Sequence, residues 1–293
     1  MLFHEGFVVC YAKPIPIPQR KEAFAQAKAM VIYMDSVRIV SLYSGSSGNA
    51  TLIETPSGSI LIDAGKSARS LTNALKQAGS DPSKILAVFV THEHTDHTSA
   101  LEVFLKKNRV PVHMTEISAK GLHSPEGSKL REAICPHTPV YSVHVADMTV
   151  TSFPVSHDSA YCVGYRVETD GGYKFGYATD TGYVTDGMKA MLDGCDSVVL
   201  ESNHNVELLK CGSYPPDTKK RILSRLGHLS NDDCAGFLHS LAEHGTKNFM
   251  LAHLSAENNR PELALDSAKH ALEDFPEAKV FIAKPDTETV FVD

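Results

Sequence analysis

Four side chains of the kinds that bind metals fall within six positions, at His92, His94, Asp96 and His97. They directly follow residues 85–90, an apolar run that predicts a buried strand. In an extended segment His92 and His94 point to the same side, and a turn into a helix starting near Thr98 swings Asp96 and His97 toward a second position. Without a partner, these groups would be buried unpaired at considerable cost in free energy. The segment therefore predicts a strand, a turn and a helix built around divalent metal, and its donor atoms suit Zn²⁺, Mn²⁺ and Fe²⁺.

Three further candidate ligands, His157, Asp180 and His253, each follow a predicted strand. Strand ends converge at one rim of a layered sheet, which is where ligands from distant segments can meet. Seven ligands are enough for two ions if Asp180 bridges them.

Strand-like and helix-like segments alternate along the chain. Strands are predicted at residues 37–43, 51–54, 59–63, 85–91, 111–114, 148–153, 161–168, 174–179, 197–201, 249–252 and 279–282. Helices are predicted at residues 68–78, 98–106, 184–192, 217–226, 231–244 and 261–275. The pattern indicates an α/β sandwich of sheets with helices on both outer faces. Residues 1–33 lack this regularity and are expected to be an N-terminal extension to a single domain at residues 34–293.

The composition argues against several classes of protein. The net charge of −7 argues against a protein that coats nucleic acid, so a polyanionic substrate would need a local positive site. Six cysteines without a closely spaced pair indicate reduced thiols, and no secretory signal is visible. With no apolar run near the roughly 20 residues of a membrane span, we expect a cytoplasmic protein without a membrane partner.

The His-x-His-x-Asp-His segment, followed by single His, Asp and His residues at strand ends, resembles the metallo-β-lactamase superfamily. The resemblance covers about residue 35 to the C-terminus and implies a four-layer αββα sandwich. It implies that His92, His94 and His157 hold one metal ion, that Asp96, His97 and His253 hold another, and that Asp180 bridges.

Residues 44–50 (SGSSGNA), residues 227–231 (GHLSN) and residues 253–255, followed by Glu257, Asn258 and Asn259, are similar to the bacterial WalJ (YycJ) group of predicted phosphodiesterases. That resemblance implies a 5′→3′ exonuclease acting on DNA. Residues 163–166 and the Gly-His-Leu-Ser segment also resemble tRNA 3′-processing endonucleases. His253 follows Asp180 by 73 positions, which is too few for the extra domain of RNase J-type nucleases.

In the expected mechanism a metal-bridging hydroxide attacks the phosphodiester, with Asp96 among the catalytic residues. His228, on a glycine-flanked turn, is the candidate proton donor to the leaving alcohol. Ser46, Ser47 and Asn49 either cradle a phosphate or form an ordinary turn. Asn231 either contacts substrate or begins a helix capped by Ser230. Glu201 either orients a histidine ligand or belongs to a plain loop.

Two other functions remain open. A thioester or lactone hydrolase similar to glyoxalase II shares the first motif, although acyl hydrolysis does not need residues 227–231. A metal-binding regulatory protein without activity is the third interpretation, and the complete ligand set argues against it.

Overall fold

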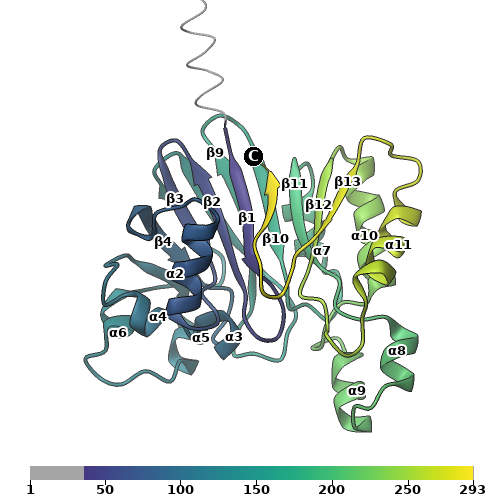
Figure 1. The fold of residues 1–293 in the computed structure, drawn as a ribbon, viewed down its shortest axis with the longest axis horizontal. Coiled ribbons are helices and arrows are strands. Elements are labelled where there is room, and N and C mark those ends of the chain that lie inside the picture. Colours follow the sequence, from purple (N-terminus) through teal and green to yellow (C-terminus); the bar gives the residue numbers. More distant parts are fainter. Residues whose placement is uncertain (1–35, 293) are drawn as a thin grey trace, which may run out of the picture.

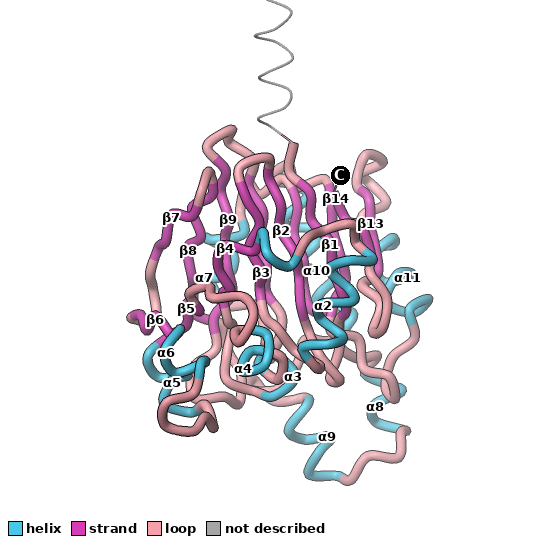
Figure 2. Tube along the Cα trace, turned by 60° about the vertical axis from the view of Figure 1, so that its left-hand side comes forward, coloured by secondary structure: helices cyan, strands magenta, loops and turns pink. Residues whose placement is uncertain are grey.

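The computed structural model of the protein describes residues 36–292. Within this range two mixed seven-stranded sheets lie face to face, and helices cover their outer surfaces (Figures 1 and 2). The strand orders are β14-β1-β2-β3-β4-β5-β6 and β13-β12-β11-β10-β9-β8-β7. This single-domain arrangement confirms the predicted αββα sandwich. The expected extension at residues 1–33 lies outside the described residues.

The first half of the chain forms most of one sheet and its helices. Its strands are β1 (Arg38–Tyr43), β2 (Ala50–Thr55), β3 (Gly58–Ile62), β4 (Ile85–Phe89), β5 (Val112–Thr115) and β6 (Ile134–His137), completed by β14 (Thr289–Val292) from the C-terminal end. Its helices are α2 (Ala68–Gln77), the 3₁₀ turn η1 (Pro82–Lys84), α3 (Thr95–Thr98), α4 (Leu101–Phe104), α5 (Glu116–Gly121) and α6 (Lys129–Ala133).

The second half forms the other sheet. Its strands are β7 (Ser142–Val145), β8 (Met148–Pro154), β9 (Val163–Thr169), β10 (Lys174–Ala178), β11 (Ser197–Glu201), β12 (Asn248–Ala252) and β13 (Lys279–Ile282). Its helices are α7 (Asp186–Leu192), α8 (Val206–Cys211), α9 (Pro216–Ile222), α10 (Asn231–Glu243) and α11 (Pro261–Ala271).

Three apolar layers hold the sandwich together. Phe89 and Tyr165 belong to the central layer, where the inner faces of the two sheets meet. Leu71 and Leu75, one helical turn apart on α2, pack against the outer face of the first sheet. Phe237 of α10 does the same for the second sheet. Each such side chain contributes about 1.5–3 kcal/mol when fully buried, so the layers fix the sheets that carry the rim.

Parallel strand pairs place the chemistry at one rim. β3 and β4 are parallel in the first sheet, and β10, β11 and β12 are parallel in the second. The carboxyl ends of parallel strands open onto the same edge, which is the usual place for a site in such sheets. This rim also carries α3, α8 and α9, at the lower edge of Figure 1.

Most predicted elements are confirmed within a few residues, but three details were wrong. The helix predicted at residues 98–106 is two short helices, and the first begins at Thr95, so Asp96 and His97 lie inside it. The helices predicted to end at residues 226 and 275 each end four residues earlier, at Ile222 and Ala271. Seven short elements went unrecognised, namely η1, α5, α6, α8, β6, β7 and β14. None of the helices between residues 36 and 292 is long and apolar enough to cross a membrane.

Candidate metal centre and active site

The seven predicted ligands come from both sheets and meet at the rim. His92 to His97 follow β4, His157 follows β8, Asp180 follows β10 and His253 follows β12. Asp180 and His253 adopt left-handed backbone, with φ of 55° and 56°, where the chain leaves the strand and turns. Such angles are uncommon for residues other than glycine, and strain of this kind gathers at functional sites.

Three histidines form the first cluster. The ring centroids of His92 and His94 lie 4.5 Å apart, and that of His157 lies 5.1 Å and 5.3 Å from them. His92 Nε2 is buried and has no hydrogen-bond partner. Burial lowers the pKa of both His92 and His157. Both imidazoles therefore favour the neutral form, which is the form that binds a metal ion.

Asp96, His97 and His253 form the second cluster. Asp96 Oδ2 lies 3.2 Å from His97 Nε2 and 3.8 Å from His253 Nε2, and the latter atom is buried without a hydrogen-bond partner. Asp180 lies between the clusters, because one of its oxygens is within 4.8 Å of ligand atoms of both His92 and His97. Burial opposes the charged form of Asp180, but His253 and His97 hold the pKa of its carboxyl well below the usual range.

In three of the candidate ligand rings, Nδ1 already faces a hydrogen-bond partner. His97 Nδ1 lies 2.7 Å from Asp63 Oδ2, His157 Nδ1 lies 3.2 Å from the Gly227 carbonyl oxygen, and His253 Nδ1 lies 2.9 Å from Glu201 Oε1. A proton on each Nδ1 satisfies that acceptor and leaves Nε2 as the ligand atom. Burial opposes the charged forms of His97 and His253, but the nearby carboxylates raise the pKa of both, so these two rings give up a proton when a cation binds. Together with the buried, unpartnered Nε2 atoms, this shows that the donor set fits divalent cations.

Asp63 holds the candidate ligand His97, and the sequence analysis missed it. It is fully buried at the end of β3 with φ of 62°, and it accepts hydrogen bonds from the Thr91 backbone and hydroxyl as well as from His97. Burial raises its pKa, while His97 acts in the opposite direction. The available signal was a carboxylate directly after an apolar strand and before Ala64 and Gly65.

Gly65 was also missed, and it explains how Asp96 is placed. A Cβ at this position would lie 1.9 Å from the Asp96 carbonyl oxygen and 2.6 Å from the Asn49 backbone nitrogen. Only glycine therefore lets the loop after β3 pass beside the first turn of α3.

Glu201 connects a ligand to the candidate proton donor. Its Oε1 lies 2.9 Å from His253 Nδ1 and 2.8 Å from His228 Nδ1, while Oε2 accepts hydrogen bonds from the backbone of Thr181 and Leu229. Burial opposes its charge, yet His228 and the hydrogen bonds lower the Glu201 pKa to about 2. Burial likewise disfavours a charged His228, but Glu201 raises the His228 pKa to about 9. Of the two interpretations of Glu201, the geometry supports the orienting one.

Of the four residues predicted to bind substrate, the two asparagines are buried and the two serines are exposed. Asn49 is buried, with its amide nitrogen 3.1 Å from His97 Nε2 and 3.3 Å from Asp96 Oδ2. Asn231 is buried too, paired with Ser202 and Asn259. Ser230 caps α10, as predicted. Ser46 and Ser47 are exposed on the rim loop.

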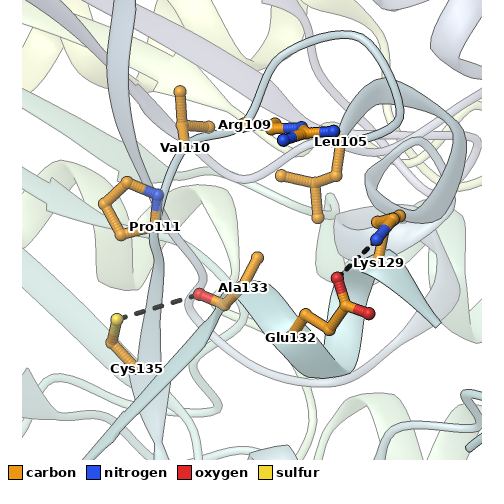
Figure 3. A pocket seen from close by; sticks show the side chains of 8 residues that line it. All are labelled: Leu105, Arg109, Val110, Pro111, Lys129, Glu132, Ala133 and Cys135. Carbon is orange, nitrogen blue, oxygen red and sulfur yellow. Dashed lines mark hydrogen bonds and ion pairs between the residues drawn. The ribbon is translucent and has the colours of Figure 1, made fainter. Parts of the chain in front are cut away.

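A hollow elsewhere on the molecule shares none of these residues. A cavity of about 380 Å³ lies between the end of α4, the start of β5 and α6 (Figure 3). Because β5 is parallel to β4, this hollow lies at the end of the sheet opposite the histidines. Lys129 in its wall is already paired with Glu132 at 2.6 Å.

The chain belongs to the beta-lactamase superfamily, because residues 59–254 match the Beta-lactamase superfamily domain. It is 37% identical over 237 residues to Exodeoxyribonuclease YycJ of Bacillus anthracis, which covers 80% of this chain and 88% of that protein. It is 36% identical over 258 residues to Exodeoxyribonuclease WalJ of Streptococcus pneumoniae serotype 2, which covers 85% of this chain and 94% of that protein. The predicted family is confirmed.

Solved structures share the fold at lower identity. The metallo-beta-lactamase fold protein YhfI from Bacillus subtilis is 17% identical, with a TM-score of 0.66 over 87% of this chain and 100% of that one. Zn²⁺-bound PqqB from Methylobacterium extorquens is 16% identical, with a TM-score of 0.65 over 86% of this chain and 99% of that one. The protein is thus a hydrolase of the metallo-β-lactamase fold whose His and Asp clusters suit a divalent metal site.

Proposed function

We propose that the protein hydrolyses phosphodiester bonds in DNA as a 5′→3′ exonuclease, using two divalent ions that are Zn²⁺ or Mn²⁺, with Fe²⁺ as a further candidate. The observation that carries the proposal is His228, held by Glu201 beside the ligand cluster and 3.8 Å from Asp180 Oδ1. An alkoxide leaving group needs a proton, and this pair supplies one. The related proteins named exodeoxyribonucleases support DNA as the substrate.

In the proposed ligand set, His92, His94 and His157 hold the first ion, Asp96, His97 and His253 hold the second, and Asp180 bridges. Two such ions bring four positive charges, which Asp96 and Asp180 only partly offset. A protein with a net charge of −7 can then attract a polyanion to its rim.

When bound, the metal ions activate water and polarise the phosphodiester. Asp96, whose side chain is 21% exposed while that of His97 is fully buried, is reachable from solvent and accepts a hydrogen bond from the attacking water. His228 keeps one proton on Nδ1 for Glu201 and donates the other from Nε2 to the departing oxygen. The exposed hydroxyls of Ser46 and Ser47 contact phosphate oxygens at the mouth of the site. Asn49 and Asn231, being buried and paired, act through the residues that they hold.

The test compares linear DNA labelled at its 5′ end or at its 3′ end, with protein loaded with Mn²⁺ or Zn²⁺. A 5′→3′ exonuclease releases the 5′ label at once as a mononucleotide or a short product. It shortens the 3′-labelled strand progressively and leaves covalently closed circular DNA intact. Cleavage of the circle would make the protein an endonuclease, and immediate release of the 3′ label would reverse the polarity.

A second pair of substrates tests the competing hydrolysis of thioesters. Bis-p-nitrophenyl phosphate should be hydrolysed much faster than lactoylglutathione. Preference for the thioester would replace the proposal with a hydrolase similar to glyoxalase II.

A further inference from the structure

A second hollow shares a wall with the candidate metal centre. It has a volume of about 340 Å³ and is lined by the segments that follow β1, β12 and β13, among them Ser44, Leu254, Ala256, Arg260, Ala283 and Lys284. This volume lies at the lower end of the range for small-ligand sites, which is roughly 300–1,000 Å³. These segments leave their strands at the same rim as the ligands, so the hollow opens beside the metal centre.

The wall between the hollow and the metal centre is fixed by hydrogen bonds. The backbone nitrogen of the ligand His253 donates to Ser44 Oγ at 2.9 Å, and the Ser44 backbone nitrogen donates to the Lys284 carbonyl oxygen at 3.0 Å. Leu254, the next residue after His253, faces the hollow. The three segments are therefore held together independently of any ligand, and the cavity has a defined position relative to the second cluster.

The lining combines two kinds of surface. Leu254, Pro261, Ile282 and Ala283 give it apolar walls, while Arg260 and Lys284 are exposed at its outer side. The Arg260 guanidinium contacts the Asn259 carbonyl oxygen, and no carboxylate within residues 36–292 pairs with it. A ligand that suits the rim hollow has a flat or apolar body and a negative charge at its outer end.

We infer that this hollow is a subsite for one nucleotide of the DNA strand, next to the phosphate being cleaved. The base lies against Leu254 and Ile282, and the neighbouring phosphate lies beside Lys284 and Arg260. The inference rests on the proposed function, and it adds the place where the strand is held.

Two substitutions test the subsite without touching a ligand. Ala256→Leu adds bulk at an exposed lining position, and Lys284→Gln removes an exposed charge while keeping the backbone contact to Ser44. Their matched controls are Ala190→Leu, on the exposed side of α7, and Lys279→Gln, at the opposite end of β13.

Ala256→Leu should raise KM for a single-stranded oligonucleotide about tenfold, while kcat/KM for bis-p-nitrophenyl phosphate stays within about twofold, because the small diester does not reach the hollow. Lys284→Gln should raise KM about threefold. It should also reduce the slope of log affinity against log salt by about one, as expected for one lost phosphate contact. Both controls should match the wild type.

Equal losses on the two substrates would overturn the inference, because they would show a distorted metal centre. Wild-type KM for DNA in both variants would overturn it as well. Calorimetric binding of deoxyadenosine monophosphate separates this inference from the proposed function. If the wild type leaves DNA intact but binds the nucleotide, and Ala256→Leu weakens that binding, the proposed function fails and the subsite stands.

Discussion

His228 lies beside the proposed ligands but belongs to the ligand set of neither ion. Its Nδ1 is held by the Glu201 carboxylate, and its ring centroid lies 5.1 Å from that of His157 and 5.2 Å from that of His253. A group in this place can transfer a proton without losing a metal ion. Its substitution therefore separates proton donation from metal binding.

His228→Ala should leave the metal content unchanged and slow DNA cleavage by about 10²–10⁴-fold, the usual value of general acid catalysis. Hydrolysis of bis-p-nitrophenyl phosphate should fall much less, since nitrophenolate leaves without a proton. The measurement is the mutant-to-wild-type rate ratio on each substrate. Equal ratios would indicate that His228 stabilises the phosphate in the transition state, and lost metal would make it a ligand.

Glu201→Gln should have a broader effect than His228→Ala. The carboxylate holds both His228 and His253, so an amide in its place weakens the proton donor and misorients a ligand. We expect metal affinity to fall by about 10–100-fold, the usual cost of losing such a supporting contact. Titrating both variants with metal, Glu201→Gln beside His228→Ala, measures this difference in affinity. Unchanged affinity in Glu201→Gln would mean that His253 keeps its orientation without the charge.

The structure brings the predicted ligands together, whereas Asp63 and Gly65, which support them, were missed for a physical reason. His92, His94, Asp96 and His97 are contiguous and end a strand, so local spacing reveals them. Asp63 acts only because β3 lies beside β4, and Gly65 is needed only because its loop passes the Asp96 backbone. Such contacts depend on packing between distant segments, which spacing along the chain does not encode.

The unrecognised elements were all short. β6, β7 and β14 have four residues each, and α5, α6 and α8 have five or six, which is too few for a hydrophobic period to emerge. Longer elements such as α10 were predicted to within one residue. Tertiary pairing determines the short ones, as in β14, which pairs with β1 from the other end of the chain.

The pairing of β5 with β6 also creates a histidine pair. His113 Nδ1 lies 2.9 Å from His137 Nε2, and the His113 ring stacks on Phe89 at 4.9 Å. Burial, reinforced by the charge of a protonated His137, lowers the pKa of His113 to about 4. Burial also lowers the pKa of His137. The folded protein therefore keeps His113 neutral in a range where the unfolded chain binds a proton.

The free energy of unfolding should therefore decrease as the pH is lowered from about 6.5 to about 4. Above this pH range His113 is neutral in both the folded and the unfolded protein, and below it His113 is protonated in both. The contribution of neutral His113 to the free energy of unfolding is therefore lost as the pH drops through the range. The slope is at most about 1.4 kcal/mol per pH unit. His113→Gln should show a shallower dependence in urea unfolding at several pH values, while the exposed control His123→Gln should follow the wild type. A wild-type slope in His113→Gln would contradict the assignment.

At the scale of the whole molecule, the rim is where the two sheets are joined. The Val163 backbone nitrogen of β9 donates to the Thr91 carbonyl oxygen at 3.1 Å, and Tyr165 donates from its hydroxyl to the Val90 carbonyl oxygen at 2.6 Å. The proposed ligands extend this seam, since His92 to His97 follow a strand of one sheet and His157, Asp180 and His253 follow strands of the other. The alternation of strands and helices already indicated a layered sandwich, and the resemblance carried by these residues implied its four αββα layers, because periodicity alone does not say which sheet faces which.

Metal removal should therefore destabilise the entire sandwich. An ion that binds only the folded state adds about 4 kcal/mol at a free concentration 1,000 times its Kd, and for a domain of this size that corresponds to a rise in Tm on the order of 10 °C. Exhaustive dialysis against a chelator should lower the Tm measured by circular dichroism, and restored Zn²⁺ or Mn²⁺ should recover it. Asp180→Asn should shrink the metal-dependent shift, because the bridge loses its charge, whereas Lys279→Gln should keep the full shift. A Tm that is indifferent to chelation, or a full shift in Asp180→Asn, would show that the ions do not tie the sheets together through this residue.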